Sequence, residues 1–162
     1  MFYKIIKNFF LKKNVVKKLT AKKLISSNDK IKTIGILVDE SNFNQTELLV
    51  EKIISQGIPK ESISVLVYKD KTKNKQNPKE PFLSLHHISI SGKIQKKEAI
   101  DFINTPFDLL LNYYDINKSA LFLISLYSKA KFKVGFETVD NRVIHFIIKS
   151  YIENYIEFII EL

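Results

Sequence analysis

Hydrophobic and polar positions follow two alternating patterns along most of the chain. Short apolar runs rich in β-branched residues are typical of strands buried on both faces of a parallel sheet. Four such runs are present, at residues 31–38, 63–68, 107–112 and 132–136. Between and after them, apolar residues recur at helical spacing and predict helices from about residue 44 to 55, over 95–103, over 116–130 and over 151–159. Alternating strands and helices with right-handed crossovers predict an α/β fold, a three-layer Rossmann-like domain with a mainly parallel sheet.

Several shorter signals mark where these elements begin and end. Asn44 and Glu47 have the spacing of an N-cap and the third helical residue, and Gly57 with Pro59 is expected to stop the same helix. The stretch 69–81 contains no apolar residue and two prolines, which indicates a solvated loop. Residues 82–90 are expected to include a short strand, and 142–148 fit either a strand or the start of a helix.

The first 28 residues differ sharply from the rest in charge. They carry eight lysines and no acidic residue, whereas the remaining 134 residues have 18 basic and 17 acidic side chains, so a total of +9 divides into +8 and +1. Apolar residues at positions 2, 5, 6 and 9 recur at helical spacing with lysines opposite. We therefore predict a basic amphipathic N-terminal helical arm over 1–28 and a single Rossmann-like domain over 29–162.

Three interpretations of the arm remain open. It can lie on an anionic membrane, bind nucleic acid phosphates, or pack as a helix on its own domain, on a protein partner or on a second copy in a homo-oligomer. Nucleic acid is less favoured, because the arm has lysine without arginine and many apolar residues. The residues expected to dock on a membrane or partner are Phe2, Lys4, Ile5, Ile6, Lys7, Phe9, Phe10, Lys12, Lys13, Lys17 and Lys18.

Ligands of such folds bind outside the carboxyl ends of the strands. Three segments with polar residues follow predicted strands, at 39–42, 113–115 and 137–142, and their ligand-binding candidates are Asp39, Asn42, Tyr113, Tyr114, Asp115, Asp140 and Arg142. Loop closure and helix capping, for example by Asp115 or Asn117, are the competing explanations. Arg142, the only arginine, can hold a carboxylate or phosphate bidentately, but an ion pair with Asp140 or Asp115 is the favoured interpretation.

Composition argues against several classes of site. The chain has no cysteine, and its four glycines are too scattered for a phosphate-binding loop, so no cofactor is expected. His86 and His87 are adjacent, and in a strand they would point to opposite faces and could not share a metal, so none is expected either. No targeting signal or membrane span is evident, which favours a cytoplasmic protein, with peripheral attachment to the inner membrane as the possibility that the arm raises.

The chain also shows two resemblances to known families. Through KTIGILVDESNF (32–43), SGKI (91–94), FDLLLNYYD (107–115), SKAKFKVGF (128–136) and VDNR (139–142), it resembles an uncharacterised bacterial family of unknown function. The unit from FDLLLNYYD to SKAKFKVGF is also similar to part of the acceptor-side, N-terminal Rossmann-like domain of heptosyltransferase-type glycosyltransferases. Those enzymes hold the nucleotide sugar with a second domain, for which 162 residues leave no room, so this resemblance supports the fold and not catalysis.

We therefore expect a non-catalytic Rossmann-like module whose basic N-terminal helix docks on a partner or anionic membrane surface. The alternative is an enzyme that binds a small ligand, such as a sugar phosphate or nucleotide, at the strand ends.

Overall fold

The computed structural model describes residues 31–70 and 82–162. The predictions made for the arm and for most of the lysine-rich loop lie outside these residues. The described strands are β1 (Ile34–Asp39), β2 (Ile63–Tyr68), β3 (Phe82–Leu83), β4 (Leu109–Tyr113), β5 (Phe132–Phe136) and β6 (Phe146–Ile148). The helices are α2 (Thr46–Ser55), α3 (Lys97–Asn104), α4 (Ser119–Tyr127) and α5 (Tyr155–Ile160), with 3-10 turns η1 (Lys60–Ser62), η2 (Leu85–His87) and η3 (Asn141–Val143).

The six strands form one sheet in the order β3-β2-β1-β4-β5-β6, and every neighbouring pair is parallel. This is the strand order of a doubly wound Rossmann-type sheet, in which the direction of winding reverses between β1 and β4. The carboxyl ends of β1 and β4 therefore border the crevice in which such folds bind ligands.

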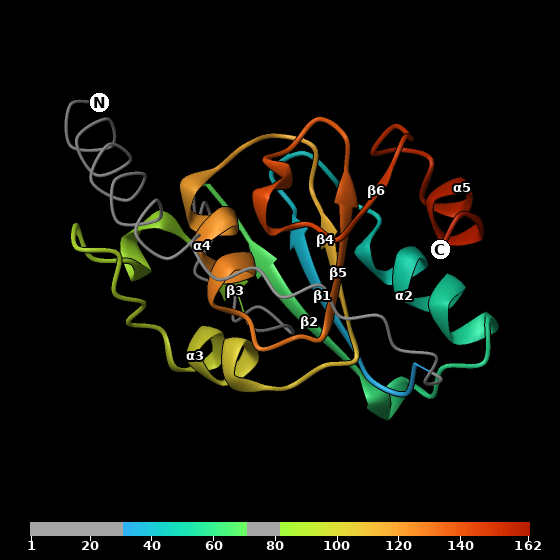
Figure 1. The fold of residues 1–162 in the computed structure, drawn as a ribbon, viewed down its shortest axis with the longest axis horizontal. Coiled ribbons are helices and arrows are strands. Elements are labelled where there is room, and N and C mark those ends of the chain that lie inside the picture. The colour runs from blue at the N-terminus through green and yellow to red at the C-terminus, as the bar shows by residue number, and fades with distance from the viewer. Residues whose placement is uncertain (1–30, 71–81) are drawn as a thin grey trace.

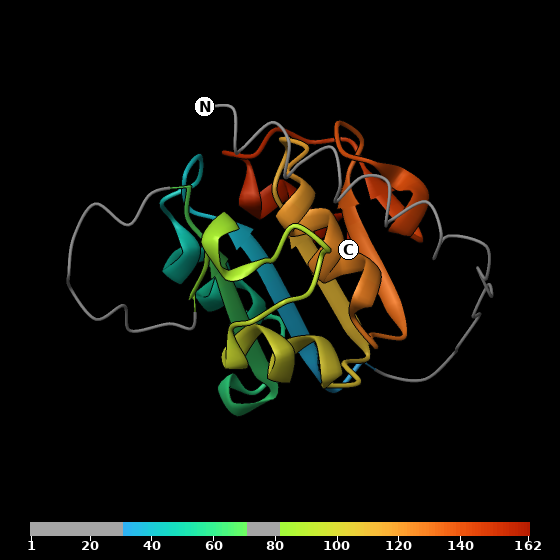
Figure 2. The same ribbon diagram turned by 90° about the vertical axis from the view of Figure 1, so that its left-hand side faces the viewer.

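Helices cover both faces of the sheet (Figures 1 and 2). Figure 1 shows α2 and α5 on one side and α3 and α4 on the other. The buried apolar side chains divide accordingly into two clusters, because successive residues of a strand point to opposite faces. In β1, Ile36 and Val38 pack on the α2–α5 side, while Leu37 packs on the α3–α4 side.

The four long strands confirm the apolar runs that predicted them. Strands β2 and β5 have the predicted bounds. Strand β1 begins three residues later than predicted, and β4 begins two residues later. All four predicted helices are present and shorter than their patterns suggested. The segment 142–148 contains the last residues of η3 and then β6, and Gly57, with a φ of +95°, follows the end of α2 as expected.

Three local predictions were wrong. The residue before α2 is Gln45 rather than Asn44, and it makes no side-chain cap; the residue before α4 is Lys118, so neither Asp115 nor Asn117 caps that helix. His86 and His87 lie in the 3-10 turn η2 instead of a strand, and the strand itself is limited to two residues.

In the part of the chain that the structure describes, no helix is long and apolar enough to cross a membrane.

Candidate functional site

A network of charged side chains lies at the point where the strand order reverses. Asp39 ends β1, and the pleat of the strand directs it toward the same side as Leu37 and α4. Lys118 stands directly before α4, and its Nζ lies 2.5 Å from Asp39 Oδ2 and 2.8 Å from Asp70 Oδ2. We call Asp39, Asp70 and Lys118 the switch-point cluster.

The Asp39 carboxylate accepts three hydrogen bonds, although only 1% of the surface of this residue is exposed. Its Oδ1 accepts the backbone N–H of Ser41 at 3.0 Å, and its Oδ2 accepts the side-chain amide of Asn42 at 3.0 Å as well as the Lys118 ammonium. The backbone carbonyl of Asp39 also accepts the N–H groups of Asn42 and Phe43. The carboxylate thus gathers three donors at the end of β1, from Ser41, Asn42 and Lys118.

Asp70 and Tyr68 complete the cluster from β2. The Tyr68 hydroxyl donates to Asp70 Oδ1 at 3.0 Å, and the Asp70 backbone N–H donates to Ser41 Oγ at 2.9 Å. The Lys118 ammonium stands 5.1 Å from the centre of the Tyr68 ring, within the range of a cation–π contact. Burial, and then the neighbouring Asp70 carboxylate, raises the pKa of Tyr68 well above its ordinary value, so its hydroxyl stays protonated.

The charge of the cluster decides which ligands it can accept. Two carboxylates and one ammonium leave a formal charge of −1 at neutral pH. Such a centre repels phosphates; its carboxylates accept hydrogen bonds from hydroxyl groups and attract cations. Within the described residues, no group of three or more histidine and carboxylate side chains is placed to hold a metal ion.

The other predicted ligand-binding residues lie apart from this cluster. Arg142 holds the Asp140 carboxylate through both Nε and Nη2, with its Nε 2.8 Å from Oδ1, and it lies over the Phe122 ring at 5.3 Å. Asn117 ties this loop to the one before α4 by accepting the Asp140 backbone N–H at 2.7 Å. The ion pair between Arg142 and Asp140, which the sequence favours, is therefore present.

Two of the remaining candidates are core residues. Tyr113 is 0% exposed and donates its hydroxyl to the Ile152 carbonyl at 2.7 Å, whereas Tyr114 packs in the cluster on the opposite face. Asp115 follows them at the surface and is partly exposed. A ligand role for these three side chains stays a prediction. Of the seven predicted residues, only Asp39 belongs to the switch-point cluster, and Asn42 is bonded to it.

Asp70, Lys118 and Tyr68 were not predicted from the sequence, and Ser41 was included only as part of the segment 39–42. Asp70 follows β2 at the carboxyl edge of the sheet. Ligands of such folds bind along this edge, so Asp70 was as good a candidate as Asp39, which ends β1. Since the sequence does not reveal that β2 neighbours β1, it places Asp70 only in the polar loop. Lys118 carries no signal, being one of 25 lysines in the chain.

Two hollows of about 600 and 620 Å³ are also present on the surface, and neither is lined by a member of the switch-point cluster. The Asp39 and Lys118 side chains are 2% and 15% exposed, and that of Asp70 is 35% exposed. This geometry defines the class of protein: an α/β domain with a six-stranded parallel sheet whose switch point is bridged by ion pairs.

Comparison with known proteins places the chain in a family. A family model described as "Family of unknown function (DUF6913)" matches residues 7–162, and the chain belongs to this family. No curated protein and no solved structure matched the chain. The similarity to heptosyltransferase-type enzymes therefore stays a prediction.

Proposed function

We propose that this protein is a non-catalytic interaction module whose basic, amphipathic N-terminal segment attaches the domain to an anionic membrane surface. The observation that carries the first half of the proposal is the buried Asp39 carboxylate at the switch point. It already accepts hydrogen bonds from Ser41, Asn42 and Lys118, and Lys118 pairs with it from the other half of the sheet.

The second half of the proposal is supported by the distribution of charge. Eight lysines without an acidic residue occupy positions 1–28, and an apolar row at positions 2, 5, 6 and 9 accompanies the first of them, while the rest of the chain has a formal charge of +1. Each basic residue near an anionic bilayer contributes about 1 kcal/mol, and apolar side chains add to this by insertion. A surface that binds through charge alone would not need the apolar row.

Deletion of residues 1–25 tests this proposal. We expect the full chain to sediment with vesicles that contain anionic lipid and to remain in the supernatant with neutral vesicles, whereas the deletion variant should bind neither. Binding of the full chain to RNA of mixed sequence with equal strength would instead favour a nucleic acid partner. If membrane binding, RNA binding and self-association are all unchanged by the deletion, the proposal fails.

A second candidate function rests on the switch-point cluster itself. Asp39, Asp70 and Lys118 place three ionisable groups within hydrogen-bonding distance at the position where α/β enzymes bind their ligands. Because the cluster has a net negative charge, an uncharged sugar suits it better than a sugar phosphate or nucleotide. A thermal-shift screen of sugars, sugar phosphates and nucleotides tests this candidate, since a saturating ligand raises the apparent stability. A ligand that stabilises the native chain but not an Asp70→Asn variant would support a ligand-binding site at the cluster, and turnover of that ligand would then show an enzyme.

A further inference from the structure

Three polar side chains lie in the interior between the sheet and α4. Lys133 of β5 is 8% exposed, and Asn112 of β4 and Ser125 of α4 are 0% exposed. The two strand residues lie on the α3–α4 side, because their neighbours Leu111 and Val134 pack in the apolar cluster on the opposite side. We call Lys133, Asn112 and Ser125 the interior polar cluster.

The Lys133 ammonium caps the C-terminal end of α4. It donates to the Ser125 carbonyl, which is among the last four carbonyls of the helix and has no partner within it. The backbone N–H of Lys129, which would bond this carbonyl if the helix continued, donates to the Ile103 carbonyl instead, at 2.9 Å. A cation at this end also meets the negative pole of the helix dipole. Within the described residues this is the one hydrogen bond of the ammonium group, which has three N–H donors.

Asn112 and Ser125 each have a buried oxygen that no described residue satisfies. The Nδ2 of Asn112 donates to the Val134 carbonyl at 3.0 Å, which fixes the orientation of the amide and leaves Oδ1 as an acceptor. Within residues 31–70 and 82–162, neither Asn112 Oδ1 nor Ser125 Oγ has a hydrogen-bond partner. Buried polar atoms of native proteins nearly always have a partner, either in the protein or in ordered water. These two atoms therefore indicate a bound molecule.

The register of the sheet brings the three groups to one place. Asn112 is the register partner of Gly135, two residues beyond Lys133 on β5. From the strand spacing and the rise per residue, the Cα of Asn112 lies about 8 Å from that of Lys133. The Asn112 amide reaches β5 at Val134, the residue next to Lys133. Since the Lys133 ammonium reaches α4 at Ser125, the bonds of the cluster link β4, β5 and α4 around one position.

The surroundings of this position limit the size of a bound molecule. Gly135 has no side chain and Ser125 has a short one, so neither fills the space beside the Asn112 amide. Ile144 restricts this space, because its Cδ1 would lie 3.0 Å from a Cβ at position 135. The rest of the layer between the sheet and α4 is apolar. The bound molecule must therefore be small, and a water molecule takes up only about 30 Å³.

The donors and acceptors of the cluster select the molecule. An anion would suit the Lys133 ammonium but would be repelled by the Asn112 Oδ1 acceptor, and a cation would be repelled by the ammonium. Water can accept a hydrogen bond from Lys133 and donate to the two unsatisfied oxygens, which gives it the two to four bonds of a typical buried water. We propose that one water molecule binds in the interior polar cluster as a fixed part of the fold and bonds to all three side chains. The inference goes beyond the proposed function, because it concerns neither the N-terminal segment nor the switch-point cluster.

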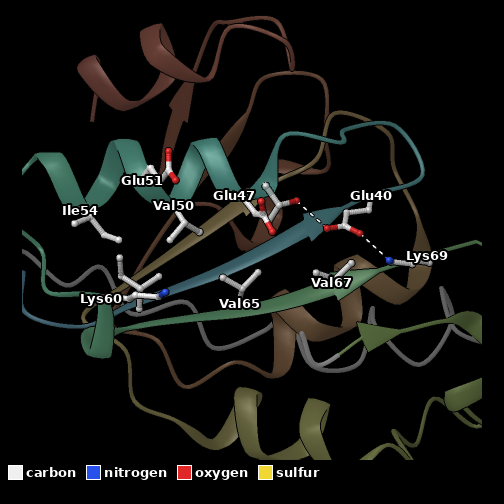
Figure 3. A pocket seen from close by; sticks show the side chains of 11 residues that line it. Glu40, Glu47, Val50, Glu51, Ile54, Lys60, Val65, Val67 and Lys69 are labelled. Atoms are coloured by element: carbon white, nitrogen blue, oxygen red, sulfur yellow. Dashed lines mark hydrogen bonds and ion pairs between the residues drawn. The ribbon is translucent and has the colours of Figure 1, made fainter. Parts of the chain in front are cut away.

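Polar groups at the hollow beside α2 show a different situation (Figure 3). There, Thr46 donates to Glu40 at 3.0 Å, and Glu40 pairs with Lys69 at 2.8 Å. Glu47 and Glu51 line the same hollow and are exposed, so bulk water solvates them. Bulk water has no such access to the interior polar cluster, and a bound molecule has to supply the missing hydrogen bonds there.

A high-resolution crystal structure of the native chain tests the proposal. We expect one peak of electron density within about 3.2 Å of Lys133 Nζ, Asn112 Oδ1 and Ser125 Oγ. A crystal soaked in bromide should show no anomalous signal at this position. A bromide signal there would assign the site to an anion, and absence of the peak would show that the side chains satisfy one another directly. Either result would overturn the proposal.

Oxygen-17 relaxation dispersion of the solvent signal tests the proposal in solution, because it counts the water molecules that stay bound for longer than the protein takes to tumble. Asn112→Leu removes the acceptor at similar volume and should lower this number by one. Asn104→Leu is the matched control, since its amide also donates to a carbonyl, that of Ile100 at 2.9 Å, but is exposed; it should leave the number unchanged. Equal numbers in the native chain and Asn112→Leu would contradict the proposal. Should Asn112→Leu fail to fold, the crystal structure of the native chain decides the question by itself.

Discussion

Lys118 places its ammonium group 2.5 Å from the carboxylate of Asp39 and so joins the two halves of the sheet across the point where the strand order reverses. Asp39 ends β1 and Lys118 precedes α4, so the contact bridges units that are 79 positions apart in the sequence. Because Asp39 is almost completely buried, this ion pair differs in kind from the exposed pairs on the rest of the described surface. It lies at the position where α/β folds of this type bind ligands.

Removal of the Lys118 charge should destabilise the domain strongly. A Lys118→Met variant leaves the buried Asp39 carboxylate without its cation, which costs about 3 kcal/mol of unfolding free energy. Lys131→Met is the matched control, because Lys131 pairs with Asp108 at 2.7 Å but is mostly exposed, and its loss should cost less than about 1 kcal/mol. Urea unfolding of both variants measures the difference, and equal losses would contradict the structural role of the pair.

Lys133 should make the stability depend on pH at alkaline values. It is 8% exposed, its ammonium donates to the Ser125 carbonyl, and no ion pair of Lys133 is found in the described part of the chain. Burial lowers the pKa of Lys133 to about 8. Between this value and its ordinary pKa of 10.5, the unfolded chain binds the proton more tightly, so this residue raises the stability as the pH increases.

A Lys133→Met variant isolates this effect. At pH 7 we expect the variant to be more stable than the native chain by roughly 2 kcal/mol. The variant avoids the cost of burying a charge, and this gain exceeds the loss of the hydrogen bond to the Ser125 carbonyl. The advantage should shrink between about pH 8 and pH 10, as the native lysine loses its proton. Thermal unfolding of both proteins at about pH 7 and about pH 10 tests this prediction. A stability difference between the two proteins that is the same at both pH values would refute it.

Gly35 should tolerate no side chain, because Phe107 packs directly against it. A Cβ at this position would lie 2.6 Å from Cδ2 of the Phe107 ring, which is buried and contacts Phe102 with ring centres 5.1 Å apart. Gly35→Ala should therefore cost about 1–3 kcal/mol through overpacking, and adding Phe107→Leu should recover part of the loss. Gly135→Ala serves as control, since its Cβ would meet the flexible end of Ile144 at 3.0 Å and should cost less. Urea unfolding of the three variants measures these costs, and equal losses for the two glycine variants would contradict the argument.

Asp108 should contribute stability that is lost in acid. Its Oδ1 accepts the Lys131 ammonium and its Oδ2 the backbone N–H groups of Lys32 and Thr33, and these bonds, that of Lys131 first, lower the pKa of Asp108 to about 2. Because the folded carboxylate holds its proton less tightly, the stabilisation is complete above about pH 4 and disappears as the pH falls toward about 2. An Asp108→Asn variant should lose stability less steeply over this range, and parallel acid-unfolding curves would contradict this.

The fold was largely predictable because its strands carry strong local signals. ISVLVY and FKVGF are apolar runs too short for buried helices, and they gave the bounds of β2 and β5 directly. The failures were at the helix starts, where Gln45 and Lys118 precede α2 and α4 without side-chain caps. Capping signals failed there because most of the stability of a helix in a protein comes from the packing of its apolar face, which a single capping position does not reveal.

The site was less predictable because it depends on contacts between distant segments. The strand-end rule found Asp39 and Asn42, but the order of the strands is needed to bring Asp70 beside them. Lys118 reaches Asp39 through space, and no spacing in the sequence marks it. The ion pair of Arg142 was predicted with Asp140 or Asp115 as its partner, and the structure shows Asp140, its neighbour in the same loop.

Vesicle co-sedimentation of two full-length variants tests the central claim most directly. Ile5→Ser with Ile6→Ser and Phe9→Ser removes the apolar row but keeps all eight lysines, whereas Lys4→Gln with Lys7→Gln, Lys12→Gln and Lys13→Gln keeps the row and removes half of the charge. We predict that the native chain binds vesicles containing anionic lipid and that each variant binds at least about tenfold more weakly, because insertion and charge both contribute. Equal binding of the native chain and both variants, or binding of none of them, would contradict the account.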